Sequence, residues 1–121
     1  MTSSFYHRLK RLPAAFLLLT AGCHSAFIEA TIRNRMDRPI SLVELDYPSA
    51  SFGTQTLAPN QDFHYRFKVL GSGNLKLIYT DTAHVEHDIA GPHLDEGEEG
   101  SLTVTIAAGR VDWSPQLLAR R

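Results

Sequence analysis

The chain has 121 residues, and its 12 Lys and Arg are nearly balanced by 13 Asp and Glu, which gives a formal net charge of −1. This length suits one domain with its own core and leaves no room for two. Because no basic excess is present to neutralise phosphates, the composition argues against a nucleic-acid partner.

The first 22 residues have the three parts of a secretory signal peptide. The basic residues Arg8, Lys10 and Arg11 come first, an apolar stretch over residues 12–19 follows, and small residues end the segment. The apolar stretch is shorter than the ~20 residues that a membrane-spanning helix needs, so we expect cleavage and not a permanent span. Removal of residues 1–22 leaves 9 basic and 13 acidic residues, and the resulting net charge of −4 also argues against attraction to anionic lipid.

Residues 19–23, with the sequence Leu-Thr-Ala-Gly-Cys, place two small residues before the only cysteine of the chain. This segment resembles the lipobox of bacterial lipoproteins. The resemblance implies cleavage between Gly22 and Cys23, a diacylglycerol thioether on Cys23, and a lipidated N-terminus over residues 23–25 that is held in the cell envelope. By the same resemblance, His24 in place of Asp favours the outer membrane, with the domain facing the periplasm or the cell surface. The alternative is an ordinary secretory signal followed by a coincidental or buried cysteine.

After residue 25, apolar and polar residues alternate in short segments, which is typical of β-strands. Residues 25–36 and 40–47 are predicted to pair as a hairpin, and residues 51–57 to form an edge strand. Residues 63–69 alternate most clearly, with aromatic side chains on one face and cationic side chains on the other. Further strands are predicted over residues 75–80, 84–90 and 101–107. This pattern predicts a single all-β domain over residues 26–109, folded as a seven-stranded antiparallel sandwich.

The predicted sandwich resembles immunoglobulin-like and fibronectin-type domains in architecture alone, because the Cys, Trp, Cys signature of true immunoglobulin domains is absent. The tail over residues 110–121 differs in character. Ser114 followed by Pro115 is typical of a helix start, so a short C-terminal helix is predicted over residues 116–121. Trp113 is predicted to pack on the sandwich beside it.

Three residues at alternate positions of one predicted strand, His84, Glu86 and Asp88, share a face and form a candidate surface site for Zn²⁺ or Cu²⁺. His64 or His93 from neighbouring segments would join the ligand set. The alternative interpretation is a solvated polar face of the sheet.

Two charged segments are further candidate binding sites. The basic side chains His64, Arg66 and Lys68, joined by Lys76 from an adjacent strand, form a stripe suited to phosphate or carboxylate groups of a glycan or a protein partner. The acidic loop over residues 95–100 offers the carboxylates that Ca²⁺ prefers, but it lacks the spacing of an EF-hand loop. The alternative in both cases is charge that keeps an edge or a turn in water.

No pattern in the sequence identifies a reaction. There is no nucleophile elbow around a serine and no glycine-rich phosphate loop, and the one cysteine is assigned to lipid. We therefore predict a non-enzymatic, lipid-anchored envelope module without a cofactor, monomeric as a soluble domain, that binds an envelope protein or a glycan. Two other hypotheses stay open, a periplasmic protein that binds Zn²⁺ or Cu²⁺ through surface histidines and an envelope hydrolase with two catalytic carboxylates.

Overall fold

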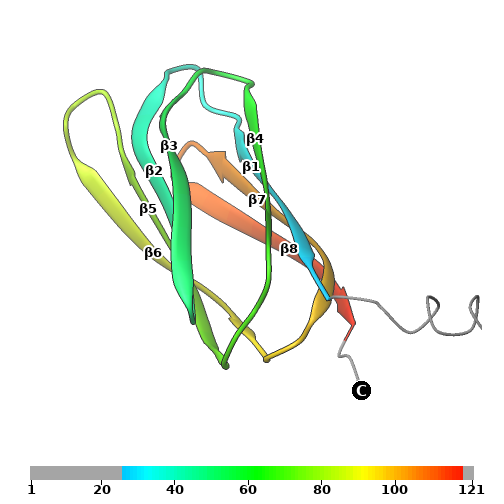
Figure 1. Cartoon of the computed structure of the whole chain (residues 1–121). Helices are drawn as coiled ribbons and strands as arrows, with labels where there is room; N and C mark the ends of the chain where they lie inside the picture. Colours follow the sequence, from blue (N-terminus) through cyan, green and yellow to red (C-terminus); the bar gives the residue numbers. More distant parts are fainter. Residues whose placement is uncertain (1–25, 119–121) are drawn as a thin grey trace, which may run out of the picture.

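The computed structural model describes residues 26–118, which form eight β-strands and contain no helix. The strands are β1 (Ile28–Asn34), β2 (Ile40–Tyr47), β3 (Ala50–Leu57), β4 (Asp62–Phe67), β5 (Gly73–Thr80), β6 (Glu86–Leu94), β7 (Glu99–Ala107) and β8 (Arg110–Leu118). They form two facing sheets, with the strand orders β4-β1-β7-β8 and β3-β2-β5-β6 (Figure 1). β1 and β7 run parallel, and all other paired strands run antiparallel. The prediction of an all-β sandwich is confirmed, whereas the prediction that all of its strands pair antiparallel is wrong for β1 and β7.

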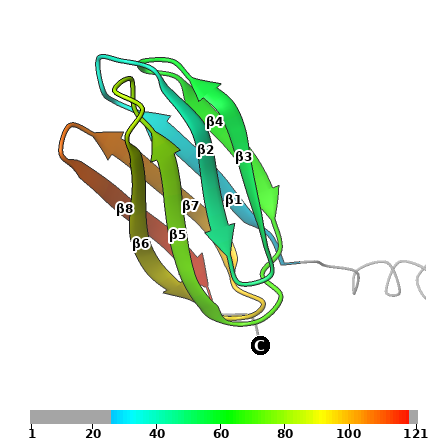
Figure 2. The same ribbon diagram turned by 90° about the vertical axis from the view of Figure 1, so that its left-hand side faces the viewer.

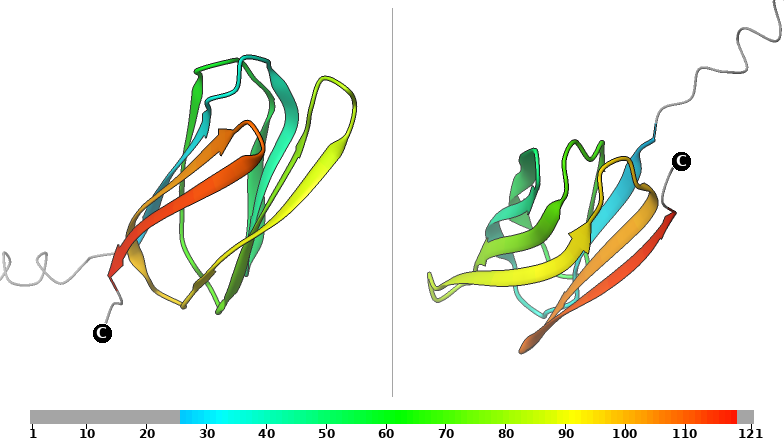
Figure 3. Two further views of the ribbon diagram at one scale, coloured as in Figure 1. Left: turned by 180° about the vertical axis from the view of Figure 1, so that it is seen from behind. Right: turned by 90° about the horizontal axis from the view of Figure 1, so that it is seen from below.

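The core lies between the two sheets. Figure 2 shows β3, β2, β5 and β6 in front of the other sheet, and the view from below in Figure 3 shows the sheets as separate layers. Apolar residues alternate along the strands, so every second side chain points inward. In β7, for example, Leu102, Val104 and Ile106 are fully buried. Each such side chain contributes about 1.5–3 kcal/mol through removal of apolar surface from water.

Aromatic rings close the side of the sandwich where the edge strands β3 and β4 come together. Phe52 of β3 stacks on Tyr65 of β4, with ring centroids 4.4 Å apart. Phe67 at the end of β4 lies 4.4 Å from the ring of Tyr47 in β2. The aromatic face predicted for residues 63–69 therefore joins the two sheets along this side.

Trp113 of β8 closes the opposite side, where β8 faces β6. The indole packs against the core and lies directly over Gly91 of β6, where an added Cβ would be only 2.6 Å from the ring atom Cη2. Because Gly91 has no side chain, the large ring can fit between the two edge strands. The prediction that Trp113 packs on the sandwich is confirmed, with a strand and not a helix carrying it.

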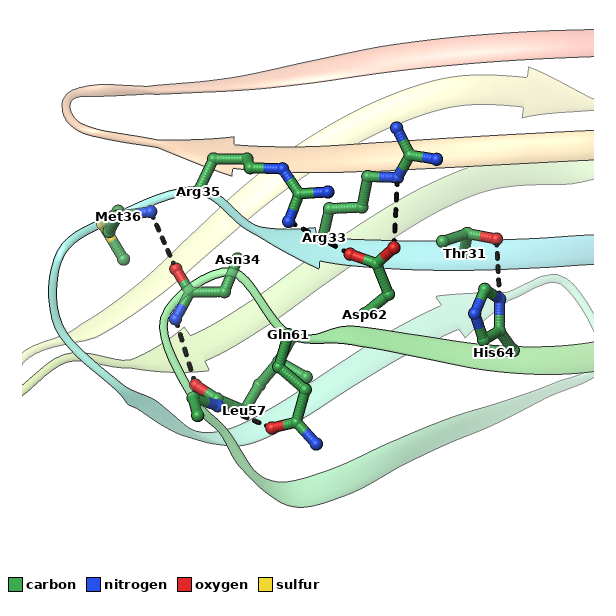
Figure 4. Close-up of polar contacts among 10 residues, drawn as sticks. Thr31, Arg33, Asn34, Arg35, Met36, Leu57, Gln61, Asp62 and His64 are labelled. Carbon is green, nitrogen blue, oxygen red and sulfur yellow. Dashed lines mark hydrogen bonds and ion pairs between the residues drawn. The ribbon is translucent and has the colours of Figure 1, made fainter.

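Asn34 is the one buried polar residue among the described core residues, and it joins four segments at one end of the sandwich (Figure 4). Its side-chain Nδ2 donates to the carbonyl oxygens of Arg38 at 2.9 Å and Leu57 at 3.0 Å, and its Oδ1 accepts from the backbone N–H of Met36 at 3.0 Å. Its backbone N–H donates to Gln61 at 3.1 Å. The side-chain amide is therefore fully hydrogen-bonded, as a buried polar group requires.

The predicted strand count and the predicted C-terminal helix are wrong. Residues 110–118 form an eighth strand, β8, which leaves the turn at Gly109 and pairs with the whole of β7. Gly109 has φ of 73°, a left-handed conformation that suits glycine in a hairpin turn. Pro115 is tolerated because β8 is an edge strand, where a residue without an N–H need not break the ladder. Residues 119–121 lie outside the described part of the chain.

The predicted hairpin of the first two strands is also wrong. β1 pairs with β4 and β7 in one sheet, whereas β2 pairs with β3 and β5 in the other. The chain crosses between the sheets at residues 35–39. Directly before this crossing, the Asn34 side chain joins the end of β1 to the end of β3 in the opposite sheet. The predicted edge position of residues 51–57 is confirmed, since β3 lies at the edge of its sheet.

Candidate functional site

The first candidate site is a cleft between the sheets at the end of the sandwich where β1 finishes. It has a volume of about 360 Å³ and is lined by apolar and polar side chains from both sheets, namely Met36, Tyr79, Asp81, His87, Ile89, Arg110 and Val111. A volume of this order is within the range of small-molecule sites. The cleft combines apolar walls with a polar cluster, which is typical of ligand-binding and active sites.

The polar cluster consists of Tyr79, Asp81 and His87 on the β5–β6 hairpin. His87 Nε2 donates to Asp81 Oδ2 at 2.8 Å, and the imidazole stacks on the Tyr79 ring with centroids 4.6 Å apart and planes inclined by 12°. Oδ1 of the same carboxylate accepts the backbone N–H groups of Ala83 at 2.9 Å and Val85 at 3.1 Å. Both oxygens of Asp81 are thus used to shape the hairpin turn.

These contacts change the acidity of two groups. The hydrogen bond from His87, followed by the backbone N–H of Val85, holds the pKa of Asp81 below its usual value. Burial, and secondly the charge of Asp81, raises the pKa of Tyr79. An Asp that orients a His is one half of a nucleophilic site, but the residues lining this cleft include no Ser, Thr or Cys to act as nucleophile. The cluster fits a structural or ligand-contacting role.

The sequence analysis did not connect His87 with Asp81. The spacing of six residues across a tight turn was the available signal, because it brings the two ends of a short hairpin together. His84 is in that turn with φ of 60°, outside β6, so the predicted strand over residues 84–90 begins two residues later.

The candidate metal ligands are not brought together. His84 lies in the turn, while Asp88 on the outer face of β6 is paired with Lys76 at 3.4 Å. His93 contacts Asn74 and Asp95 at 3.1 Å each, at the far end of β6. Within residues 26–118, no three His, Cys, Asp or Glu side chains are grouped closely enough to hold a metal ion.

The predicted basic stripe lies on β4, but without Lys76. His64 Nδ1 is hydrogen-bonded to Thr31 Oγ1 at 3.0 Å, and Arg66 pairs with Glu29 at 3.3 Å (Figure 4 shows the first contact). The Arg66 guanidinium also stacks over the Phe27 ring, 4.1 Å from its centroid. Lys68 follows β4 and is exposed. The expected addition of Lys76 is wrong, because Lys76 is on β5 in the other sheet.

The acidic loop serves the turn between β6 and β7. Glu98 accepts the backbone N–H of Asp95, and Glu96 accepts the backbone N–H of Gly71 at 2.9 Å, which ties the loop to the β4–β5 connection. Gly97 takes the left-handed φ of 79° that the turn requires. Carboxylates engaged with backbone N–H groups in this way act as turn caps.

A second hollow, of about 410 Å³, lies on the edge strand β3. It is lined by residues 42–44 of β2 and 51–55 of β3. Beside it β2 contains a bulge, since Leu42 and Val43 lie between the register pairs of Ser41 and Glu44 with β5. Leu42 has φ of 49° and is 59% exposed, a combination that is uncommon for a bulky apolar residue. Sequence reasoning predicted the edge strand but gave no indication of the bulge.

Comparison of the chain with protein-family models, with curated proteins and with solved structures finds no match. No helix among residues 26–118 is long and apolar enough to cross a membrane. The predicted signal peptide over residues 1–22 and the lipidated segment 23–25, with Cys23, lie outside the described residues.

Proposed function

We propose that this protein is a lipid-anchored module of the bacterial cell envelope that works by binding another envelope component and not by catalysis. The signal over residues 1–22 and the lipobox-like segment 19–23 support the anchor on Cys23, and His24 supports the outer membrane. Residues 24–27 alone separate Cys23 from β1, so an acyl anchor would hold the sandwich close to the membrane surface.

The observation that carries the binding role is the open edge of β3. β3 has a neighbouring strand on one side alone, and it carries no charged residue and no proline. The competing catalytic hypothesis has weaker support, because Asp81, the acid of the cleft at the end of β1, accepts three hydrogen bonds that shape the hairpin turn.

We further propose an immunoglobulin-like architecture for the sandwich. What supports it is that the two sheets face each other and that the chain crosses between them after β1, β3, β4 and β6. The eight-stranded arrangement described here departs from the seven strands of the simplest members of that architecture.

The anchor is tested by fractionating cells that express the wild-type chain or the Cys23→Ser variant. The wild type should sediment with membranes and be released by detergent alone, whereas Cys23→Ser should be found in the soluble envelope fraction. A Thr20→Ser variant, which keeps the cysteine, is the matched control and should stay with the membranes. Membrane association of Cys23→Ser in the presence of high salt would refute the anchor.

A further inference from the structure

The four edge strands of the sandwich differ in how they are protected. β4 carries Asp62 and Arg66, β6 carries Pro92 with two charged residues, and β8 carries Pro115 with two charged residues. Such charges and prolines are the usual means of preventing an edge from pairing with another chain. β3, with the sequence ASFGTQTL, has neither. It is the one edge among residues 26–118 that is ready to accept an added strand.

The surface next to this edge is hollowed at Gly53. Gly53 lies so close to β2 that an added Cβ would be 1.9 Å from the carbonyl oxygen of Val43, so only glycine fits. Gly53 and the exposed Leu42 both line the 410 Å³ hollow. Backbone strain at an exposed apolar residue is a sign of a functional position.

Carboxylates lie next to β3 on the outer face of the same sheet. One row across the strands runs from Gly53 of β3 through Glu44 and Ile78 to Asp88 of β6. The adjacent row runs from Ser51 of β3 through Asp46 and Lys76 to Ala90 of β6. Lys76 pairs with Asp88, lies next to Asp46 in the register and also attracts Glu44. Glu44 and Asp46, on β2, are the carboxylates nearest to β3. The Glu44 and Asp46 carboxyl groups lie close together. A hydrogen bond with Asp46, and secondly the charge of Asp46, therefore raise the pKa of Glu44.

We propose that the β3 edge binds an extended segment of a protein partner as a ninth strand, with basic side chains of that segment directed to Glu44 and Asp46. Neighbouring strands lie about 4.8 Å apart, so a strand added to β3 would be about 10 Å from β2. A lysine or arginine can cross this distance over Gly53, where no side chain intervenes. Backbone hydrogen bonds supply affinity in such complexes, and alternate side chains supply specificity.

This inference rests on the proposed function for its premise that the domain works by binding, and it adds the surface and the chemistry of the partner. The probes are three synthetic peptides of about ten residues, a usual strand length, with alternating Lys/Val, Ser/Val or Glu/Val sequence. Their dissociation constants are measured against the full chain in detergent micelles, together with the backbone amide shifts of the protein.

The Lys/Val peptide should bind about tenfold more tightly than the Ser/Val peptide at low salt, and the Glu/Val peptide most weakly. Amide shifts should be concentrated on residues 50–57. The double variant Glu44→Gln, Asp46→Asn should abolish the preference for Lys/Val while leaving Ser/Val binding unchanged. Gln55→Lys, which charges the edge, should abolish binding of both peptides, and Ser114→Lys on the edge strand β8 should not.

Three results would overturn the inference, and they separate it from the proposed function. Equal binding of Lys/Val and Ser/Val at β3 would refute the basic partner but leave a strand-binding module in place. Shifts outside residues 50–57, or no saturable binding of any peptide, would refute the β3 site. Dimerisation of the wild-type chain that Gln55→Lys abolishes would show that a second copy is the occupant.

Discussion

The side-chain amide of Asn34 donates a hydrogen bond to the carbonyl oxygen of Leu57 across 3.0 Å, and this bond joins β1 of one sheet to β3 of the other. Asn34→Ala leaves that carbonyl, and the backbone N–H of Met36, without their partner in a buried site. We expect the free energy of unfolding to fall by about 2–4 kcal/mol, since each unsatisfied buried group costs about 1–3 kcal/mol. Urea denaturation measures the change.

The matched control for this variant is Asn74→Ala. Asn74 is exposed on β5, and its side-chain Oδ1 lies 3.1 Å from His93 Nδ1 at the surface. A surface change of this kind should alter stability by less than about 0.5 kcal/mol. If the two alanine variants lose the same stability, Asn34 does not have the joining role described above.

The close contact between Gly91 and Trp113 predicts a coupling that a double-mutant cycle can measure. Gly91→Ala forces a Cβ against the indole, and the overpacking should cost about 1–3 kcal/mol. Trp113→Phe removes the outer ring atoms that the Cβ would meet. Gly91→Ala should therefore cost clearly less in the Trp113→Phe background than in the wild type. Equal costs in both backgrounds would show that the indole does not lie over Gly91.

The left-handed backbone at Leu42 predicts a substitution that stabilises the protein. A left-handed backbone costs a bulky residue roughly 1–2 kcal/mol, whereas Asn tolerates it. Leu42→Asn should therefore increase the free energy of unfolding by about 1 kcal/mol. Leu70→Asn is the control, because Leu70 is also exposed, at 58%, but is not among the described residues with positive φ. Destabilisation by Leu42→Asn, with no change for Leu70→Asn, would show that Leu42 is not strained.

The low pKa of Asp81 predicts a loss of stability in acid. A carboxyl group whose pKa is lowered by folding stabilises the folded state above its unfolded value of 3.8, and this contribution disappears as pH falls through the lower folded value. Asp81→Asn removes that titration. Between about pH 5 and 2 the wild type should lose more stability than Asp81→Asn, as measured by denaturation at each pH. Parallel curves for the two proteins would contradict the contacts described for this carboxylate.

The strand faces could be predicted from the sequence because side chains alternate with a period of two. For β2, residues 40–47 were predicted with the observed bounds, and the aromatic and cationic faces of β4 were assigned correctly. Alternation does not specify which strands become neighbours. Lys76 was expected beside the β4 stripe but lies in the opposite sheet, because pairing depends on contacts between distant parts of the chain.

Local signals misled where the tertiary context outweighs them. Ser114 and Pro115 are typical of a helix start, yet the edge of a sheet accepts proline as readily, and Gly109 supplies the turn into β8. Only the uncharged character of the β3 site could be predicted from the sequence. The absence of charge in residues 50–57 is visible in the sequence, whereas the bulge at Leu42 and the row from Gly53 to Glu44 depend on pairing across three strands.

The proposed function depends most on the anchor at Cys23, and intact-mass measurement of the protein extracted from cell membranes tests this anchor most directly. We predict a chain that begins at Cys23 and carries the added mass of acyl groups on that residue. A chain that begins elsewhere, or one whose Cys23 thiol is free to react with an alkylating reagent, would contradict the lipid-anchored module proposed here.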